Sequence, residues 1–123
     1  MNDRELLELA ARAAGNGCTW CEFWETMARP LNDGSGWDNR ATWNPLKDDG
    51  DALRLAVRLG LTVDIDLDES WTAIDYTADY QDKEIREGHG GGTDPYGATR
   101  LAIVRAAAEI GKSMTQPGAT SSP

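Results

Sequence analysis

The sequence predicts an α+β domain in which three helices pack on a small antiparallel sheet of about four strands. Three observations indicate this class. Three segments carry apolar residues at helical spacing between residues typical of helix ends, one segment alternates apolar and polar residues, and short turns join neighbouring segments of strand character. The predicted order is α-β-β-α-β-β-α over a single domain at residues 1–111. A disordered tail rich in Ser, Thr and Pro is predicted over residues 112–123.

The first helix is predicted to follow Asn2, which fits a capping box with Glu5, and to end at Gly15. Residues 18–27 are rich in aromatic side chains and carry no helix-start signal, so they predict a strand. Residues 37–43 predict a second, short strand, which follows a loop of turn-forming residues.

The second helix is predicted over residues 51–59, with Asp49 or Asp51 as its N-cap and Gly60 at its end. Asp51 is also placed to pair with Arg54, three residues later. Apolar side chains cover most of the helix circumference: Leu53, Leu55, Ala56, Val57 and Leu59. We therefore expect this helix to be packed on more than one side.

The clearest pattern in the chain is an alternation over residues 61–68. Four aliphatic residues alternate there with Thr62, Asp64, Asp66 and Asp68. A period of two over eight residues predicts a half-buried antiparallel strand with an acidic outer side. Residues 71–77 predict the returning strand of a hairpin, which carries Asp75.

Residues 78–87 predict either a short helix or an irregular segment, and the glycines at 88–92 predict a mobile loop. A third helix is predicted to begin after an N-cap at Asp94, with Pro95 in its first turn, and to end at Gly111. Because its residues are nearly all apolar, we expect it to be the main lid on the sheet.

The net charge of −9 is concentrated in one third of the chain. Residues 61–94 carry ten acidic and two basic side chains, a net charge of −8. Nucleic acids and anionic membranes bind through Lys and Arg, so a surface of this sign repels both. It either attracts a basic surface of another protein or serves solubility.

Targeting signals and a membrane span are not predicted. No apolar run approaches the roughly 18 residues that span a bilayer. The N-terminal residues lack the basic-then-apolar layout of a signal peptide. The two cysteines do not make a disulfide framework, which fits a reducing compartment. We therefore expect a cytoplasmic protein.

Two stretches resemble a known family: WNPLKDDGDALRLAV at residues 43–57 and DPYGATRLAIVRAAAEIG at residues 94–111. They are similar to small proteins of tailed bacteriophages and prophages, in which a Trp-Asn-Pro-Leu segment precedes an Asp-Gly-Asp-Ala-Leu helix start and a Tyr-Ala-Thr-Arg helix closes a phage alpha-beta-alpha sandwich domain. The resemblance covers residues 43–66, the third helix and, loosely, the first, but not residues 16–42 or 70–93. It implies a phage origin, the cytoplasm of a bacterial host and a fold, and no catalytic residues.

The sequence predicts no metal site and no cofactor. Cys18 and Cys21 form a CxxC pair, but structural zinc takes four ligands and the only further soft ligand is His89. A redox pair needs its first cysteine at a helix N-terminus, whereas strand-like residues follow here. We expect structural cysteines, with metal binding and redox chemistry as alternatives. The glycines at 88–92 lack the GK[ST] ending of a phosphate loop.

The candidate partner-binding residues form two groups. The first is acidic: Asp64, Asp66, Asp68 and Asp75. The second is Trp37, Asp38 and Arg40, because a partly exposed Trp beside an Arg is typical of interface hot spots. A solvated strand face and a core Trp are the alternatives.

The concentrated acidic charge, the small size and the lack of a catalytic set favour a non-enzymatic binding protein. The resemblance to phage proteins implies that its partner is a bacterial host protein with a basic surface, which it inhibits or redirects, for example as an anti-defence (anti-CRISPR-like) inhibitor. The alternatives are a protein that binds a small molecule or nucleotide, and an accessory of the virion or its assembly.

Overall fold

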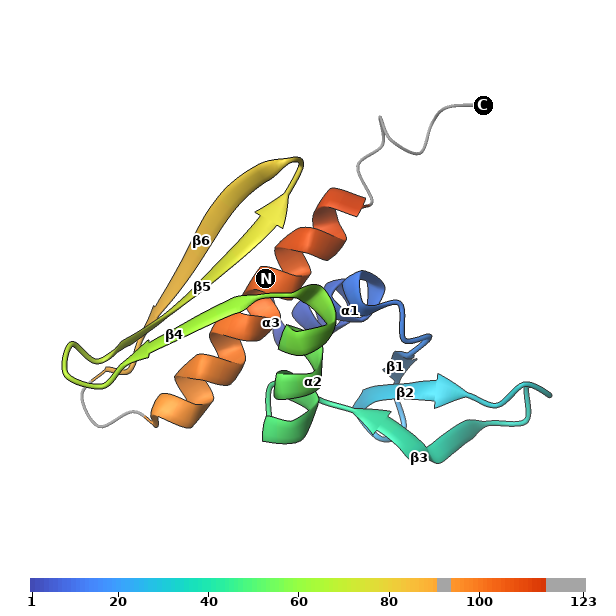
Figure 1. Cartoon of the computed structure of the whole chain (residues 1–123). Coiled ribbons are helices and arrows are strands. Elements are labelled where there is room, and N and C mark those ends of the chain that lie inside the picture. Colours follow the sequence, from blue (N-terminus) through green and yellow to red (C-terminus); the bar gives the residue numbers. More distant parts are fainter. Residues whose placement is uncertain (91–93, 115–123) are drawn as a thin grey trace.

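The structure is a computed structural model, and it describes residues 1–90 and 94–114. These residues form three helices and two three-stranded antiparallel sheets in the order α-β-β-β-α-β-β-β-α (Figure 1). The α+β class is therefore confirmed. The prediction of one sheet of about four strands in the order α-β-β-α-β-β-α was wrong, because each half of the chain holds one strand more than predicted.

The first sheet contains β1 (Thr19–Cys21), β2 (Thr26–Pro30) and β3 (Trp37–Trp43), in that order. The single strand predicted at 18–27 is in fact two strands, because a turn lets Cys21 pair with Thr26. Glu25, the last residue of that turn, has a positive φ of 50°. The predicted strand at Trp37–Trp43 is confirmed.

The second sheet contains β4 (Thr62–Asp66), β5 (Trp71–Ala78) and β6 (Gln81–Gly88), with β5 in the centre. β6 replaces the predicted short helix or irregular segment. The turn before it consists of Asp79 and Tyr80, whose φ angles are both positive, at 54° and 62°. Tight hairpins usually fill such positions with glycine, so this turn carried no recognisable signal.

The first two helices follow their capping residues closely. In α1 (Asp3–Ala14) the Asn2 side chain accepts a hydrogen bond from the Glu5 backbone at 2.8 Å, as predicted. In α2 (Asp49–Leu59) the cap is Asp48 and not the predicted Asp49 or Asp51, and it accepts from the Asp51 backbone at 2.9 Å. Helices that end at a left-handed glycine gain backbone hydrogen bonds there, as α1 and α2 both do.

The third helix, α3 (Pro95–Met114), does not end at Gly111 but continues for another three residues. Gly111 lies against α1, and a Cβ atom there would overlap the carbonyl group of Leu9. This glycine is therefore required by helix packing and not by a helix end. Of the predicted loop at 88–92, residues 91 and 92 lie outside the described residues, whereas Gly88 ends β6. The predicted start of the tail at residue 112 was wrong, because residues 112–114 belong to α3, and residues 115–123 are not described.

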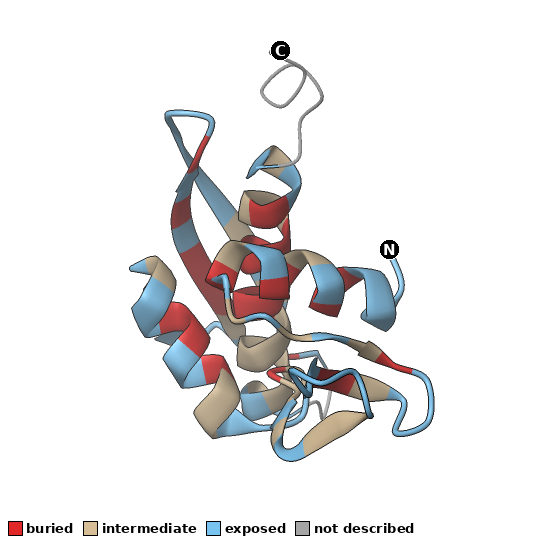
Figure 2. Cartoon of the chain, turned by 90° about the vertical axis from the view of Figure 1, so that its right-hand side faces the viewer, coloured by how far each residue is buried: buried red, intermediate tan, exposed pale blue. Residues whose placement is uncertain are grey.

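The described chain is arranged in layers around α3. One side of α3 packs on β5 and β6, which confirms its predicted role as the lid of a sheet, and α1 and α2 pack on other sides. Buried positions concentrate where the helices face one another and the sheet (Figure 2). A smaller cluster of Leu7, Ala11 and Met27 joins α1 to the first sheet. Along the described residues, no helix is both long and apolar enough to cross a membrane.

Candidate functional site

The outer face of the second sheet is set by the alternation along β5. Thr72, Ile74 and Tyr76 are buried on the side of α3, so the residues between them point away from it. One of these is Asp75, which pairs with Thr62 on β4 and with Glu84 on β6. The cross-strand register therefore decides which side chains share the outer face.

Five carboxylates share this outer face, and we call them the acidic face: Asp64, Asp66, Asp75, Asp82 and Glu84. All are exposed except Asp66, which is half-buried. Asp75 and Glu84 are directly opposite each other, an arrangement of like charges that destabilises a sheet. The acidic face therefore concentrates negative charge at a cost to the fold.

Arg86 is the one cation on the outer side of the described strands of this sheet. Its guanidinium lies over the Trp71 ring, 4.1 Å from the ring centre, and 3.4 Å from a carboxylate oxygen of Glu84. Stacking on Trp71 fixes the arginine at one end of the face. None of the ion pairs within the described part of the chain includes Asp64, Asp75 or Asp82.

The structure brings together Asp64, Asp66 and Asp75 from the acidic group that the sequence predicted. Asp68 is exposed in the turn after β4, because the strand ends at Asp66 and not at residue 68. The acidic prediction missed Asp82 and Glu84. Only one of the eight residues of β6 is apolar, so no alternation marked the strand that carries them.

The second predicted group lies on β3, in the first sheet: Trp37, Asp38 and Arg40. The Asp38 side chain accepts a hydrogen bond from the Arg40 backbone at 2.9 Å, so it stabilises the local backbone of β3. The Arg40 side chain is exposed, and Trp37 is half-buried. The two predicted groups therefore belong to different sheets and do not form one continuous strand face.

A mainly apolar groove of about 540 Å³ opens between α2, β4 and the first turns of α3. The side chains that form most of it are Leu53, Val63, Ile65, Leu67, Tyr96 and Ile103. Sequence reasoning missed this groove, because it expected α2 to be packed on more than one side and β4 to be half-buried. α2 does contact both α3 and α1, but its side with Leu53 and Val57 is exposed. The expectation of a half-buried β4 was wrong, because its apolar side chains are exposed too.

The reason lies in how the helices meet the sheet. α2 packs on α3 through Ala52, Leu55 and Ala56, and this leaves Leu53 and Val57 exposed. α3 packs on β5 and β6, and residues 62–65 of β4 are all exposed. The apolar residues that a continuous core would have buried therefore line an open groove.

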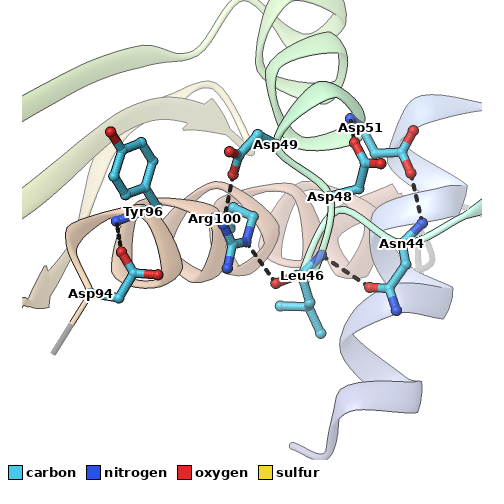
Figure 3. Close-up of polar contacts among 8 residues, drawn as sticks. All are labelled: Asn44, Leu46, Asp48, Asp49, Asp51, Asp94, Tyr96 and Arg100. Carbon is cyan, nitrogen blue, oxygen red and sulfur yellow. Dashed lines mark hydrogen bonds and ion pairs between the residues drawn. The ribbon is translucent and has the colours of Figure 1, made fainter.

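Arg100 fixes the relative position of two walls of the groove (Figure 3). From α3 it donates one hydrogen bond to the Leu46 carbonyl at 2.9 Å and another to Asp49 at 2.6 Å. The Arg100 side chain is 18% exposed, whereas Asp49 is 66% exposed, so the bond to the Leu46 carbonyl is the better shielded of the two. The start of α2 is thereby tied to the first turns of α3.

The aspartates before and within α2 have structural partners. Asp48 caps the helix, and Asp51 accepts from the Asn44 backbone at 3.0 Å. Asp51 also pairs with Arg54 at 2.8 Å, which confirms the predicted contact. The polar side chains of residues 48–51 therefore hold the start of α2 in place.

The two cysteines are free thiols. Cys21 is fully buried, and Cys18 is half-buried. Burial raises the pKa of the Cys18 thiol, with a smaller opposing effect of Arg29. Redox-active cysteines usually have a lowered pKa, so Cys18 has the opposite property. Among the described residues, no three His, Cys, Asp or Glu side chains group so as to hold a metal ion.

His89 is buried, although the sequence suggested a mobile glycine loop. Its Nε2 atom lies 2.8 Å from the Thr72 hydroxyl, which in turn lies 2.9 Å from the Thr99 hydroxyl. The His89 backbone also donates to the Ser70 carbonyl at 2.8 Å. These bonds join β5, the end of β6 and α3, so His89 serves the fold.

Comparison with protein-family models, curated proteins and solved structures returned no match.

The described residues present two exposed features on the second sheet. The acidic face presents carboxylates from three neighbouring strands, and the apolar groove begins at the free edge of the same sheet. Basic side chains are attracted by the first feature, and apolar side chains are desolvated by the second.

Proposed function

We propose that this chain is a non-enzymatic binding protein whose acidic face occupies a basic surface of another protein. The observation that carries the proposal is the opposition of Asp75 and Glu84 on neighbouring strands, within a face of five carboxylates and one arginine. Like charges in this arrangement lower stability, which is understandable if the face meets cations in a complex.

The resemblance to phage proteins supports a bacterial host protein as the partner. Host factors that handle nucleic acid have basic channels, and an acidic protein that fills such a channel competes with the nucleic acid. An anti-defence inhibitor is the concrete form of this proposal.

The test compares two double variants with equal change in net charge. Asp75→Asn/Glu84→Gln removes the opposed pair, and Glu22→Gln/Glu25→Gln removes two exposed carboxylates of the turn between β1 and β2. Each protein serves as bait in a bacterial lysate, and a captured protein is purified and titrated against wild type and both variants. Loss of the opposed pair relieves repulsion, so weak binding by that variant does not reflect unfolding.

We expect Asp75→Asn/Glu84→Gln to weaken the measured affinity at least about tenfold and to flatten its dependence on salt. The control variant should bind within about twofold of wild type, because its carboxylates lie in a turn of the other sheet and its one ion pair, between Glu22 and Arg4, is exposed. Equal affinities of the three proteins, or a partner with an acidic binding surface, would overturn the proposal.

A further inference from the structure

β4 is an edge strand with an uncovered apolar side. Among the described strands it pairs with β5 alone. Val63 and Ile65 on β4 are 37% and 49% exposed, whereas Ile74 and Thr72, their cross-strand neighbours on β5, are fully buried. The side chains on the α3 side of the sheet are therefore buried on β5 but exposed on β4.

Two further apolar side chains face the groove from other elements. Leu53 on α2 is 63% exposed and Tyr96 on α3 is 67% exposed, and both line the groove together with Val63 and Ile65. Figure 3 shows the Tyr96 ring standing out from the start of α3 on the side where α2 begins. An inner row of side chains on a strand added beside β4 would enter this space.

We infer that β4 accepts one additional strand, supplied by an extended segment of a partner protein in which basic and apolar residues alternate. The free edge of β4 provides main-chain hydrogen bonds. Because strand side chains alternate, one row of the added strand fills the groove and the other lies beside Asp64 and Asp66. The inference rests on the proposed function and names the partner segment that the acidic sheet recognises.

The same charges disfavour a second copy of this chain as the occupant. If β4 paired antiparallel with its own copy, with both apolar sides on one face, Asp64 and Asp66 would meet aspartates of the copy directly or diagonally. Edge strands commonly carry charges that prevent such self-association. The aspartates thus oppose self-pairing and favour a strand with Lys or Arg at alternate positions.

The probe for this inference is a fluorescein-labelled nine-residue peptide in which Lys and Val alternate. A second peptide has the same composition with Lys and Val in separate blocks. Two further peptides keep the alternation and carry N-methyl groups at every second backbone nitrogen, one on the odd and one on the even positions. Fluorescence anisotropy measures the binding of each peptide to the full chain.

We expect the alternating peptide to bind at least tenfold more tightly than the block peptide. Only one of the two N-methylated peptides should lose this binding, because the amides of alternate residues point to opposite edges of a strand. Equal binding of the alternating and block peptides would overturn the inference, as would equal behaviour of the two N-methylated peptides.

Two variants of α2 test whether the peptide binds in the groove. Leu53→Gln should weaken binding of the alternating peptide at least fivefold, and Val57→Gln should change it less than twofold. Both side chains are exposed, at 63% and 72%, but only Leu53 lines the groove. Equal effects of the two changes would contradict the location.

The outcomes separate this inference from the proposed function. If the lysate partner ignores Asp75→Asn/Glu84→Gln while the alternating peptide depends on Leu53, the acidic-face function fails and the groove site stands. If the partner depends on that double change while the peptides bind alike, the function stands and strand addition is overturned. Dimerisation that Leu53→Gln abolishes, or a gain of helical circular dichroism in the bound peptide, would assign the groove to another occupant and also overturn strand addition.

Discussion

Cys18 shows how burial changes the chemistry of a single residue. The thiol is half-buried, and its Sγ atom lies 3.9 Å from the Ala41 carbonyl oxygen. Desolvation raises the pKa of Cys18, and the nearby Asp51 raises it further. A raised pKa leaves less thiolate at a given pH, so the residue is a weak nucleophile near neutral pH.

We expect native Cys18 to react with iodoacetamide more slowly at pH 8 than the same residue in the urea-unfolded chain. The native rate should rise as the pH passes above the ordinary pKa of the thiol, since only the thiolate attacks. Mass spectrometry of peptides distinguishes Cys18 from the fully buried Cys21, which should react only after unfolding. Equal rates at pH 8 in the native and unfolded chains would contradict this account.

At the scale of elements, the contact between α1 and α3 depends on the absence of one side chain. A Cβ atom at Gly111 would overlap the Leu9 carbonyl group, which is backbone and cannot turn away. Two helices that approach this closely exclude any larger residue at the crossing, because interiors are packed without spare room.

Gly111→Ala should lower the free energy of unfolding by about 1–3 kcal/mol, although alanine is the better helix former. The control is Gly97→Ala in the same helix, where the nearest atoms to an added Cβ lie 3.7 Å away. That change should leave stability unchanged or raise it. Urea unfolding of both variants measures the difference, and a stabilising Gly111→Ala would show that the helices are farther apart.

The sequence predicted elements well where local chemistry decides them. Asn2, Gly15 and Gly60 marked helix ends because capping acts within one turn. β6 was missed because its turn lacks glycine and Ile85 is its only apolar residue. Gly111 was misread because a packing glycine and a terminal glycine look alike until the neighbouring helix is known.

The candidate site was predictable only in the part that lies on one strand. Alternation placed Asp64 and Asp66 on a common side, whereas the addition of Glu84 depends on the register between β5 and β6. The groove depends on where α2 stands relative to β4. That position depends on packing between segments distant in the sequence, and local sequence patterns do not predict such packing.

At the scale of the whole molecule, the two sheets differ in how many buried residues pack against them. The main core cluster contains fifteen buried residues from α1, α2, β5 and α3, whereas three buried residues join α1 to the first sheet. Regions with few buried apolar contacts open at lower free energy than the core. The first sheet should therefore open while the remainder of the fold stays closed.

Amide hydrogen exchange measures this difference directly. Under native conditions, the amides hydrogen-bonded in β1–β3 should exchange at least about tenfold faster than those in β5 and the centre of α3. Uniform protection of the two sheets would show instead that the chain unfolds as one cooperative unit.

The hydrogen bonds of Arg100 also bear on the order of folding. They join residues 54 and 51 positions apart in the chain, and they set two walls of the groove. Contacts between such distant residues form only after a long loop has closed. The groove therefore forms only once α3 has docked against the start of α2, and a nascent chain cannot engage a groove ligand before then.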